Sequence, residues 1–235
     1  MKVNEKIAAA LIVAAGMVGM GGALRCGIVR FKDMDRSVTV TGLAEQEVKA
    51  DKVTWSLCYK ELGNDPAQMY DLLEEKNGKV LAFLRSGGIQ DADIIVNPPV
   101  INDRQADNYG NEIMKYRYKA KSVITVTSKE VEKIQNLLKR QSELMKQGIA
   151  LVSNEYESSN VIYEFTRLNE VKPAMVEEAT RNARTTAQKF ADDSDSQLGS
   201  IRNAQQGQFS ISDRDANTPH IKNIRVVTTI EYSLK

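Results

Sequence analysis

Few residues of this chain have the types and spacing that catalysis or metal binding requires. The single histidine, His220, lies in the turn-rich stretch DRDANTPHIKN. Acid–base catalysis by histidine needs a partner that orients the ring, and a metal site usually needs several imidazoles or thiolates. The nucleophile-elbow, P-loop, dinucleotide-binding and paired CxxC patterns are absent from the sequence. We therefore expect His220 to be an ordinary surface side chain.

The densest acidic stretch is DDSDS, residues Asp192–Ser196. A calcium loop begun at Asp193 would place Asp195 at its third position, but it lacks the glycine and the glutamate required at the sixth and twelfth. The pattern favours a solvated helix end, and we interpret Asp213 and Asp215 in the same way. The sequence thus predicts no catalytic, cofactor-binding or metal-binding residue, no cofactor, and a protein that is not an enzyme.

The tryptophan and the two cysteines have structural interpretations. Trp55 alternates with other apolar residues and is expected in the core, with Cys58 on the opposite face of the same strand. Cys26 follows Arg25, whereas a lipidated cysteine follows a small residue, so we do not expect lipidation. A disulfide between Cys26 and Cys58 stays open, because two cysteines do not define a redox compartment.

The N-terminus has the pattern of a targeting segment. Lys2 and Lys6 precede Ile7–Leu24, a run of 18 residues without a charge, which is close to the length of a membrane-spanning helix. Two interpretations remain: a retained anchor that uses residues 7–24, or a signal cleaved after Ala23. Both place the body on the periplasmic side of the cytoplasmic (inner) membrane. We assign residues 1–25 to this segment and 26–36 to a connector.

Small residues recur within the apolar run at Ala15, Gly19 and Ala23, which would share one face of a helix. Alanine and glycine dominate the segment, so we interpret this ladder as a product of composition.

The charge of the body argues against a nucleic-acid partner. Residues 26–235 carry 29 basic and 30 acidic side chains, well mixed along the chain. Nucleic-acid binding usually needs a clustered basic face.

Hydrophobic periodicity predicts strands and helices in the order ββα-β-βα-ββα-β-β over residues 37–235. Hairpins mixed with helical crossovers predict an α+β domain, in which mixed or antiparallel sheets pack on about three helices. A hydrophobic N-terminal helix precedes this domain. The polar stretch 97–111 is expected to be a loop and a seam between two lobes.

Local signals set the expected helix bounds. The first helix is capped by Asn64 or Asp65, has Pro66 in its first turn and ends at Gly87-Gly88. The second starts with a capping box formed by Thr127 and Glu130. The third, residues 170–193, is expected to bury one seam of residues: Val176, Ala179, Ala183, Ala187 and Phe190.

The strand expectations are equally local. The stretch GIQDADIIV is expected to be a strand. Residues 148–158 and 160–167 are expected to form a hairpin around Ser158-Ser159. The last strand is expected to alternate, with one face formed by Ile224, Val226, Thr228 and Ile230.

Four stretches together resemble the SIMPL domain family (DUF541), and in particular exported bacterial members such as the Brucella periplasmic antigen. They are SVTVTGLAEQEVKADKVTWSL, GIQDADIIV, EEATRNARTTAQKFADDSDSQLGSI and IRVVTTIEYSL. The likeness covers about residues 37–235. The chain departs from the family pattern at Leu43, Ala50 and Ser194, where a glycine, a proline and a glycine are common.

The resemblance implies an α+β fold outside the cytoplasmic membrane and, for the Brucella-like members, assembly into a large ring-shaped oligomer associated with envelope stress. It implies no catalytic residue. We therefore expect a homo-oligomer with a structural role in the cell envelope. The alternative is a monomeric or dimeric binding module for another envelope protein or a small ligand, with residues 97–111 as its binding loop.

Overall fold

The computed structural model describes residues 14, 16–25, 36–106, 114–153 and 161–235. The chain divides into two compact units, which we treat separately. Unit 1 comprises residues 1–46, 169–210 and 224–235, and unit 2 comprises residues 47–168 and 211–223. The stretch 97–111, expected as a seam, belongs to unit 2, so the division between the units falls elsewhere in the chain.

Only part of the predicted N-terminal segment is described. Residues 16–25 form helix α1 and are exposed, whereas residues 7–13 and 15 lie outside the described residues, as does Cys26. Over the described stretches, no helix combines the length and the apolar character that crossing a membrane requires.

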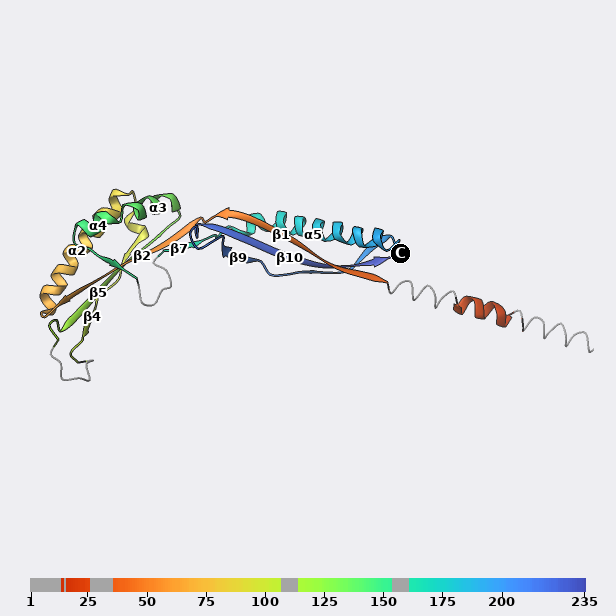
Figure 1. Ribbon diagram of the computed structural model, residues 1–235, viewed down its shortest axis with the longest axis horizontal. Coiled ribbons are helices and arrows are strands. Elements are labelled where there is room, and N and C mark those ends of the chain that lie inside the picture. The colour runs from red at the N-terminus through yellow and green to blue at the C-terminus, as the bar shows by residue number, and fades with distance from the viewer. Residues whose placement is uncertain (1–13, 15, 26–35, 107–113, 154–160) are drawn as a thin grey trace, which may run out of the picture. The chain divides into compact units, whose positions relative to one another are not determined.

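Unit 1 is built on a sheet with the strand order β1-β10-β8; β9, which also pairs with β10, lies mostly in the residues of unit 2. These strands are β1 (Ser37–Lys49), β8 (Leu198–Gln206), β9 (Ser210–Asp213) and β10 (Ile221–Leu234). Helix α5 (Leu168–Asp193) runs along β1 and β10 (Figure 1). The predicted alternation of the last strand is confirmed, because Ile224, Val226, Thr228 and Ile230 are all buried.

The buried stripe of α5 differs from the predicted seam at both ends. Its members recur every fourth residue: Met175, Ala179, Ala183, Ala187 and Ala191. The prediction of Phe190 as a core residue is wrong, since 55% of it is exposed, and Val176 is only partly buried.

The buried stripe needs small side chains because α5 lies very close to β1 at Gly42. A Cβ added to Gly42 would come within 1.9 Å of the backbone oxygen of Ala179 and 2.6 Å of the backbone nitrogen of Ala183. Glycine on one element and alanine on the other therefore set the distance between strand and helix.

Unit 2 contains a sheet with the order β3-β5-β2-β6, in which β4 pairs with β5 and β7 with β2. Its centre is an antiparallel pair, β2 (Lys52–Gly63) and β5 (Tyr118–Ser128), in unbroken register from Val53 opposite Ser128 to Gly63 opposite Tyr118. The shorter strands are β3 (Ile94–Val96), β4 (Val100–Asp103), β6 (Leu151–Val152) and β7 (Val161–Glu164).

Helices α2 (Pro66–Ser86), α3 (Val131–Arg140) and α4 (Ser142–Lys146) pack on one face of this sheet (Figure 1). Between them they bury the alternate residues of β2, including Trp55, which is 2% exposed. The prediction of Trp55 as a core residue is confirmed, and Cys58 is fully buried too. The α+β class is likewise confirmed.

The bounds of α2 confirm the capping prediction. The Asp65 carboxylate accepts hydrogen bonds from the backbone nitrogens of Ala67 and Gln68, Pro66 occupies the first turn, and Gly87 follows the last helical residue.

Some local predictions are wrong in detail. The predicted capping box does not form: Glu130 makes no side-chain cap, Thr127 remains in β5, and the Ser128 hydroxyl accepts from the Glu130 backbone instead. The stretch GIQDADIIV is a 3₁₀ turn, Asp91–Asp93, followed by the three residues of β3. The predicted loop 97–111 contains β4, which pairs with β5.

The predicted hairpin of residues 148–167 is replaced by a nonlocal arrangement. Strands β6 and β7 both pair antiparallel with β2, at Cys58–Tyr59 and at Lys52–Trp55 respectively. The predicted turn residues, Ser158 and Ser159, lie outside the described residues.

Candidate functional site

The structure places His220 at the wall of a hollow in unit 2, where it is half-buried. Its ring meets the Tyr163 ring edge-on, with centroids 6.0 Å apart and an angle of 62° between the planes. Its backbone oxygen accepts a hydrogen bond from the Ala50 nitrogen. His220 therefore helps to pack the wall, which the sequence did not predict.

The hollow, which we call the β5–α3 hollow, has a volume of about 520 Å³. It is lined by the end of β1 and the turn after it, by residues 129–135 at the junction of β5 and α3, and by Arg167 and His220. This volume is within the range of small-molecule sites in proteins, although charged side chains dominate the wall.

Each carboxylate in the wall of the β5–α3 hollow faces a base. Asp51 pairs with Arg167, and Glu130 lies 2.7 Å from Lys133. Glu132 lies 3.9 Å from Lys49, and both of these side chains are largely exposed. A carboxylate neutralised by a neighbouring base is poorly suited to take a proton from a substrate. The arrangement is better suited to bind a charged ligand than to catalyse a reaction.

Asp51 fixes the wall by joining two distant parts of the sequence. Its carboxylate accepts hydrogen bonds from the backbone nitrogens of Thr166 (2.9 Å) and Arg167 (3.2 Å), and from both of their side chains. Burial by itself raises the pKa of Asp51, but these hydrogen bonds outweigh it and lower the pKa below the ordinary value.

The lowered pKa gives Asp51 a predictable effect on stability. A carboxyl group with a lower pKa in the folded state stabilises the fold above its unfolded pKa of about 3.9, and loses this effect as the pH falls through the folded value. We expect Asp51→Asn to lower the free energy of unfolding at pH 7 by about 2 kcal/mol, since hydrogen bonds to a charged group are lost. Urea titrations at pH 7 and pH 3 should show the difference between wild type and variant shrinking at pH 3.

The matched control for Asp51→Asn is Asp91→Asn. Asp91 pairs with Arg85 at 2.7 Å, but both side chains are more than half exposed, so a change within about 0.5 kcal/mol is expected. A difference for Asp51→Asn that is equal at both pH values would contradict the assignment.

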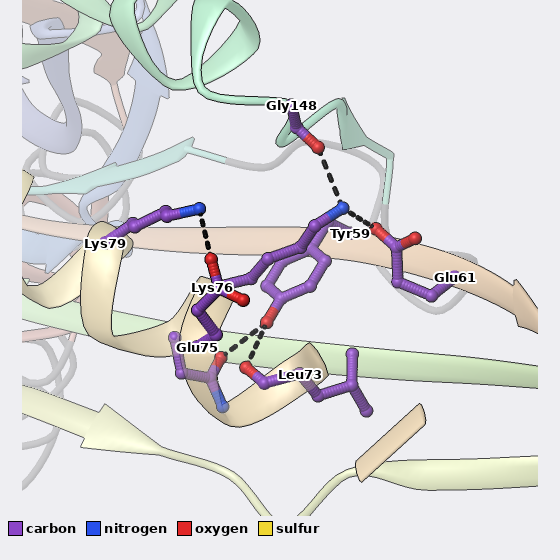
Figure 2. Close-up of polar contacts among 8 residues, drawn as sticks. Tyr59, Glu61, Leu73, Glu75, Lys76, Lys79 and Gly148 are labelled. Carbon is purple, nitrogen blue, oxygen red and sulfur yellow. Dashed lines mark hydrogen bonds and ion pairs between the residues drawn. The ribbon is translucent and has the colours of Figure 1, made fainter. Parts of the chain in front are cut away.

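A second polar cluster lies between α2 and β2 in unit 2. The Lys76 ammonium forms an ion pair with Glu61 and donates to the Gly148 backbone oxygen at 2.8 Å (Figure 2). The side chains of Lys76 and Glu61 are only 12% and 20% exposed. This ion pair ties the middle of α2 to the end of β2 and to the turn after α4, where Gly148 adopts a φ of +77°.

Tyr59 extends this cluster into the core. Its hydroxyl faces the Leu73 backbone oxygen at 3.0 Å and the Asn77 Oδ1 at 2.8 Å (Figure 2). Burial raises the pKa of Tyr59 to about 12, and the negative charge of Glu61 acts in the same direction. The hydroxyl therefore stays protonated at neutral pH and serves as a donor that positions α2.

The acidic stretches named in the sequence have structural roles. Asp195 adopts a φ of +50°, and the backbone nitrogens of Ser194 and Ser196 bond to Ala191, so the DDSDS stretch ends α5. Across the parts of the chain that the structure describes, no group of three or more His, Cys, Asp or Glu side chains could hold a metal ion.

Asp213 and Asp215 also hold local structure. Asp213 forms an ion pair with Lys222. Asp215 accepts hydrogen bonds from the side chains of Thr218 and Arg214 and from two backbone nitrogens, which lowers its pKa to about 2.

In unit 1 the feature that stands out is the edge of the sheet formed by β8. Among the described residues, β8 pairs with β10 on one side only, and all its residues from Ser200 to Gln206 are exposed. Edge strands usually carry charges or proline that oppose pairing with another chain. Residues 203–210, NAQQGQFS, carry neither, whereas the first half of β8 carries Arg202 and two shifts in its register with β10.

The register of the sheet shows which backbone groups face outward. The Gly207 nitrogen donates to the Val227 oxygen at 2.8 Å, so these two residues form a hydrogen-bonded pair. Two residues earlier in β8, Gln205 lies opposite Thr229, and two residues before that, Asn203 lies opposite Glu231. Because hydrogen-bonded pairs alternate in an antiparallel ladder, the N–H and C=O groups of Ala204 and Gln206 point away from β10.

The other edge of this sheet, β1, is protected by comparison. Asn182 of α5 donates a hydrogen bond of 2.8 Å to the Leu43 backbone oxygen. The strand also carries Glu45, which lies 3.6 Å from Arg225 on β10. The β8 edge is thus the edge of unit 1 that is better suited to pair with a further strand.

The fold and these surfaces define an α+β protein of two compact units, with a charged hollow in one and an open strand edge in the other. The chain belongs to the SIMPL family: the family model, described as a protein of unknown function (DUF541), matches residues 38–229. A comparison with curated proteins finds no match to the chain.

Proposed function

We propose that this SIMPL-family protein acts outside the cytoplasmic membrane, where its body self-assembles and serves the cell envelope as a structural, non-catalytic component linked to envelope stress. It would then resemble the exported, Brucella-like members of the family. Export rests on the basic start and on the uncharged run of residues 7–24, either as a retained anchor or as a cleaved signal.

The observation that carries this proposal is the open β8 edge. An exposed strand whose second half has outward backbone groups and no charged side chain is a ready partner for another strand, and natural monomers usually avoid such an edge. The absence of catalysis is supported by the β5–α3 hollow, where Asp51 and Glu130 each pair closely with a base, and by the packing role of His220.

The test is native mass spectrometry of the full-length protein extracted in detergent from its own membranes. The subunit mass distinguishes a retained chain from one that has lost about 23 residues. The assembly mass should be a defined multiple of the subunit mass. A strictly monomeric protein at micromolar concentration would contradict the proposal.

The second candidate function is a binding module, and the β5–α3 hollow favours it. Lys129, Lys133 and Arg167 supply positive charge to a space large enough for a small ligand, next to the carboxylates of Glu130 and Glu132. A ligand carrying both a carboxylate and an amine would match this wall. If the mass spectra show a monomer with a small molecule retained, and Arg167→Ala releases that molecule, the binding module replaces the assembly as the proposed function.

A further inference from the structure

We propose that two copies of this chain join through β8, antiparallel, with a two-fold axis at Ala204, so that their unit 1 sheets become one continuous sheet. This inference rests on the proposed self-assembly and names the contact that begins it. The partner is a second copy of the same chain, and the contact is isologous, because the same strand is used on both sides.

The backbone geometry of β8 suits this pairing. The groups of Ala204 and Gln206 that point away from β10 are spaced two residues apart, as an antiparallel ladder requires. A two-fold axis at Ala204 sets residues 202–206 of one copy against residues 206–202 of the other. Ala204 then pairs with Ala204 through outward backbone groups, and Gln206 lies opposite Arg202, where the register of β8 with β10 shifts.

The charges select this register over the one centred on Arg202. Arg202 lies in the middle of β8, 3.9 Å from Glu231 of β10. An axis at Arg202 would set two arginines directly opposite each other, which is unfavourable in a sheet. An axis at Ala204 sets each arginine opposite an uncharged glutamine, and the alanine at the centre leaves room for the second strand.

The partner strand at the β8 edge comes from a second copy of this chain because the edge is complementary to itself. Asn203 of one copy lies opposite Gln205 of the other, and their amides both donate and accept, so these side chains can bond to each other across the axis. The β1 edge is a poorer partner for β8, since its Leu43 oxygen is already bonded to Asn182 and its end carries Glu45, Glu47 and Lys49.

The position of β8 in its own unit is fixed by two glycines. A Cβ at Gly199 would lie 2.3 Å from the Ser233 Oγ, and one at Gly207 would lie 2.8 Å from the Val227 oxygen. The strand is thus held close to β10 at both ends, which presents the outward groups of Ala204 and Gln206 in a defined geometry.

The first test compares Ala204→Pro with Gln205→Ala by sedimentation velocity of the full-length protein in detergent. Proline removes the outward N–H of Ala204 and leaves the β8–β10 ladder intact, which edge strands tolerate. We expect Ala204→Pro to weaken association at least about tenfold, because the central pair of the ladder is lost. Gln205→Ala keeps every outward backbone group and should associate as the wild type does.

The second test does not depend on how the proline variant folds. Ala204→Lys sets two like charges across the axis, and Ala204→Glu does the same, so each variant alone should dissociate into monomers. An equimolar mixture should recover the association, because lysine then faces glutamate. Recovery in the mixture is specific to an axis at Ala204.

The outcomes separate this inference from the proposed function. Wild-type assembly that is lost in the single charge variants and regained in the mixture supports both. Wild-type assembly that survives Ala204→Pro and both charge variants overturns the β8 contact and leaves self-assembly in place. A monomeric wild type overturns both, and capture of a different protein through β8 would overturn the choice of a second copy.

Discussion

Replacing Gly42 by alanine is expected to destabilise unit 1 by about 3 kcal/mol or more, because a close backbone contact cannot accommodate a side chain. The added Cβ would lie 1.9 Å from the Ala179 oxygen and 2.6 Å from the Ala183 nitrogen. Both atoms belong to the backbone of α5, so the whole helix must shift. That shift would open the small core formed by Val40, Ala187 and Ile230.

The change can be measured by native-state hydrogen exchange, which follows the two units separately. We expect protection of the α5 amides to fall in Gly42→Ala while that of the α2 amides is unchanged. The matched control is Gly78→Ala in α2, where an added Cβ meets nothing within 4 Å. That variant should gain about 0.5–1 kcal/mol through higher helix propensity. Unchanged α5 protection in Gly42→Ala would contradict the packing described here.

Replacing Glu61 by glutamine is expected to destabilise unit 2 by about 2–4 kcal/mol. The substitution leaves the Lys76 ammonium largely buried with the Gly148 oxygen and an amide in place of a carboxylate. Removing one partner of a buried ion pair costs more than the pair itself contributes, because the other charge loses its compensation. The cost here is below that of a fully buried pair, since both side chains keep some contact with water.

A double substitution distinguishes an uncompensated charge from lost packing. Glu61→Leu combined with Lys76→Met should recover most of the stability lost in Glu61→Gln, as measured by urea unfolding. The exposed pair of Glu75 and Lys79 on the same helix, 2.6 Å apart, provides the control. Its disruption by Glu75→Gln should leave the free energy of unfolding nearly unchanged, because the pair is exposed to solvent. Equal effects at both pairs would contradict the burial of Lys76.

Features determined by neighbouring residues could be predicted from the sequence. The start of α2 depends on Asp65 and Pro66, and its end on Gly87, all within the helix or next to it. The alternation of β10 and the burial of Trp55 follow in the same way from a period of two.

Features determined by distant residues could not. Phe190 was expected in the core because its helical spacing put it on one seam with Ala183 and Ala187, but the buried stripe continues to Ala191 instead. Strands β6 and β7 were expected to pair with each other, yet each pairs with β2. Local hairpin signals do not reveal such competition from a central strand.

The candidate sites were missed for the same reason. Asp51 and Arg167 meet across 116 positions of sequence, and a single chain gives no signal of that contact. The β8 edge had a visible sign in the uncharged stretch NAQQGQFS, but its meaning depends on the strand order, which leaves β8 at the edge of the sheet.

The central claim, that copies of this chain join at β8, is tested most directly by disulfide crosslinking in the native membrane. Ala204→Cys in a Cys26→Ser background should form a dimer on mild oxidation, because the paired Cα atoms at the axis would be about 5.5 Å apart. Ser200→Cys on the same exposed strand should not, since its two copies would be about 27 Å apart. A crosslinked dimer for Ala204→Cys alone is the predicted result. Equal crosslinking at both positions, or at neither, would contradict the account.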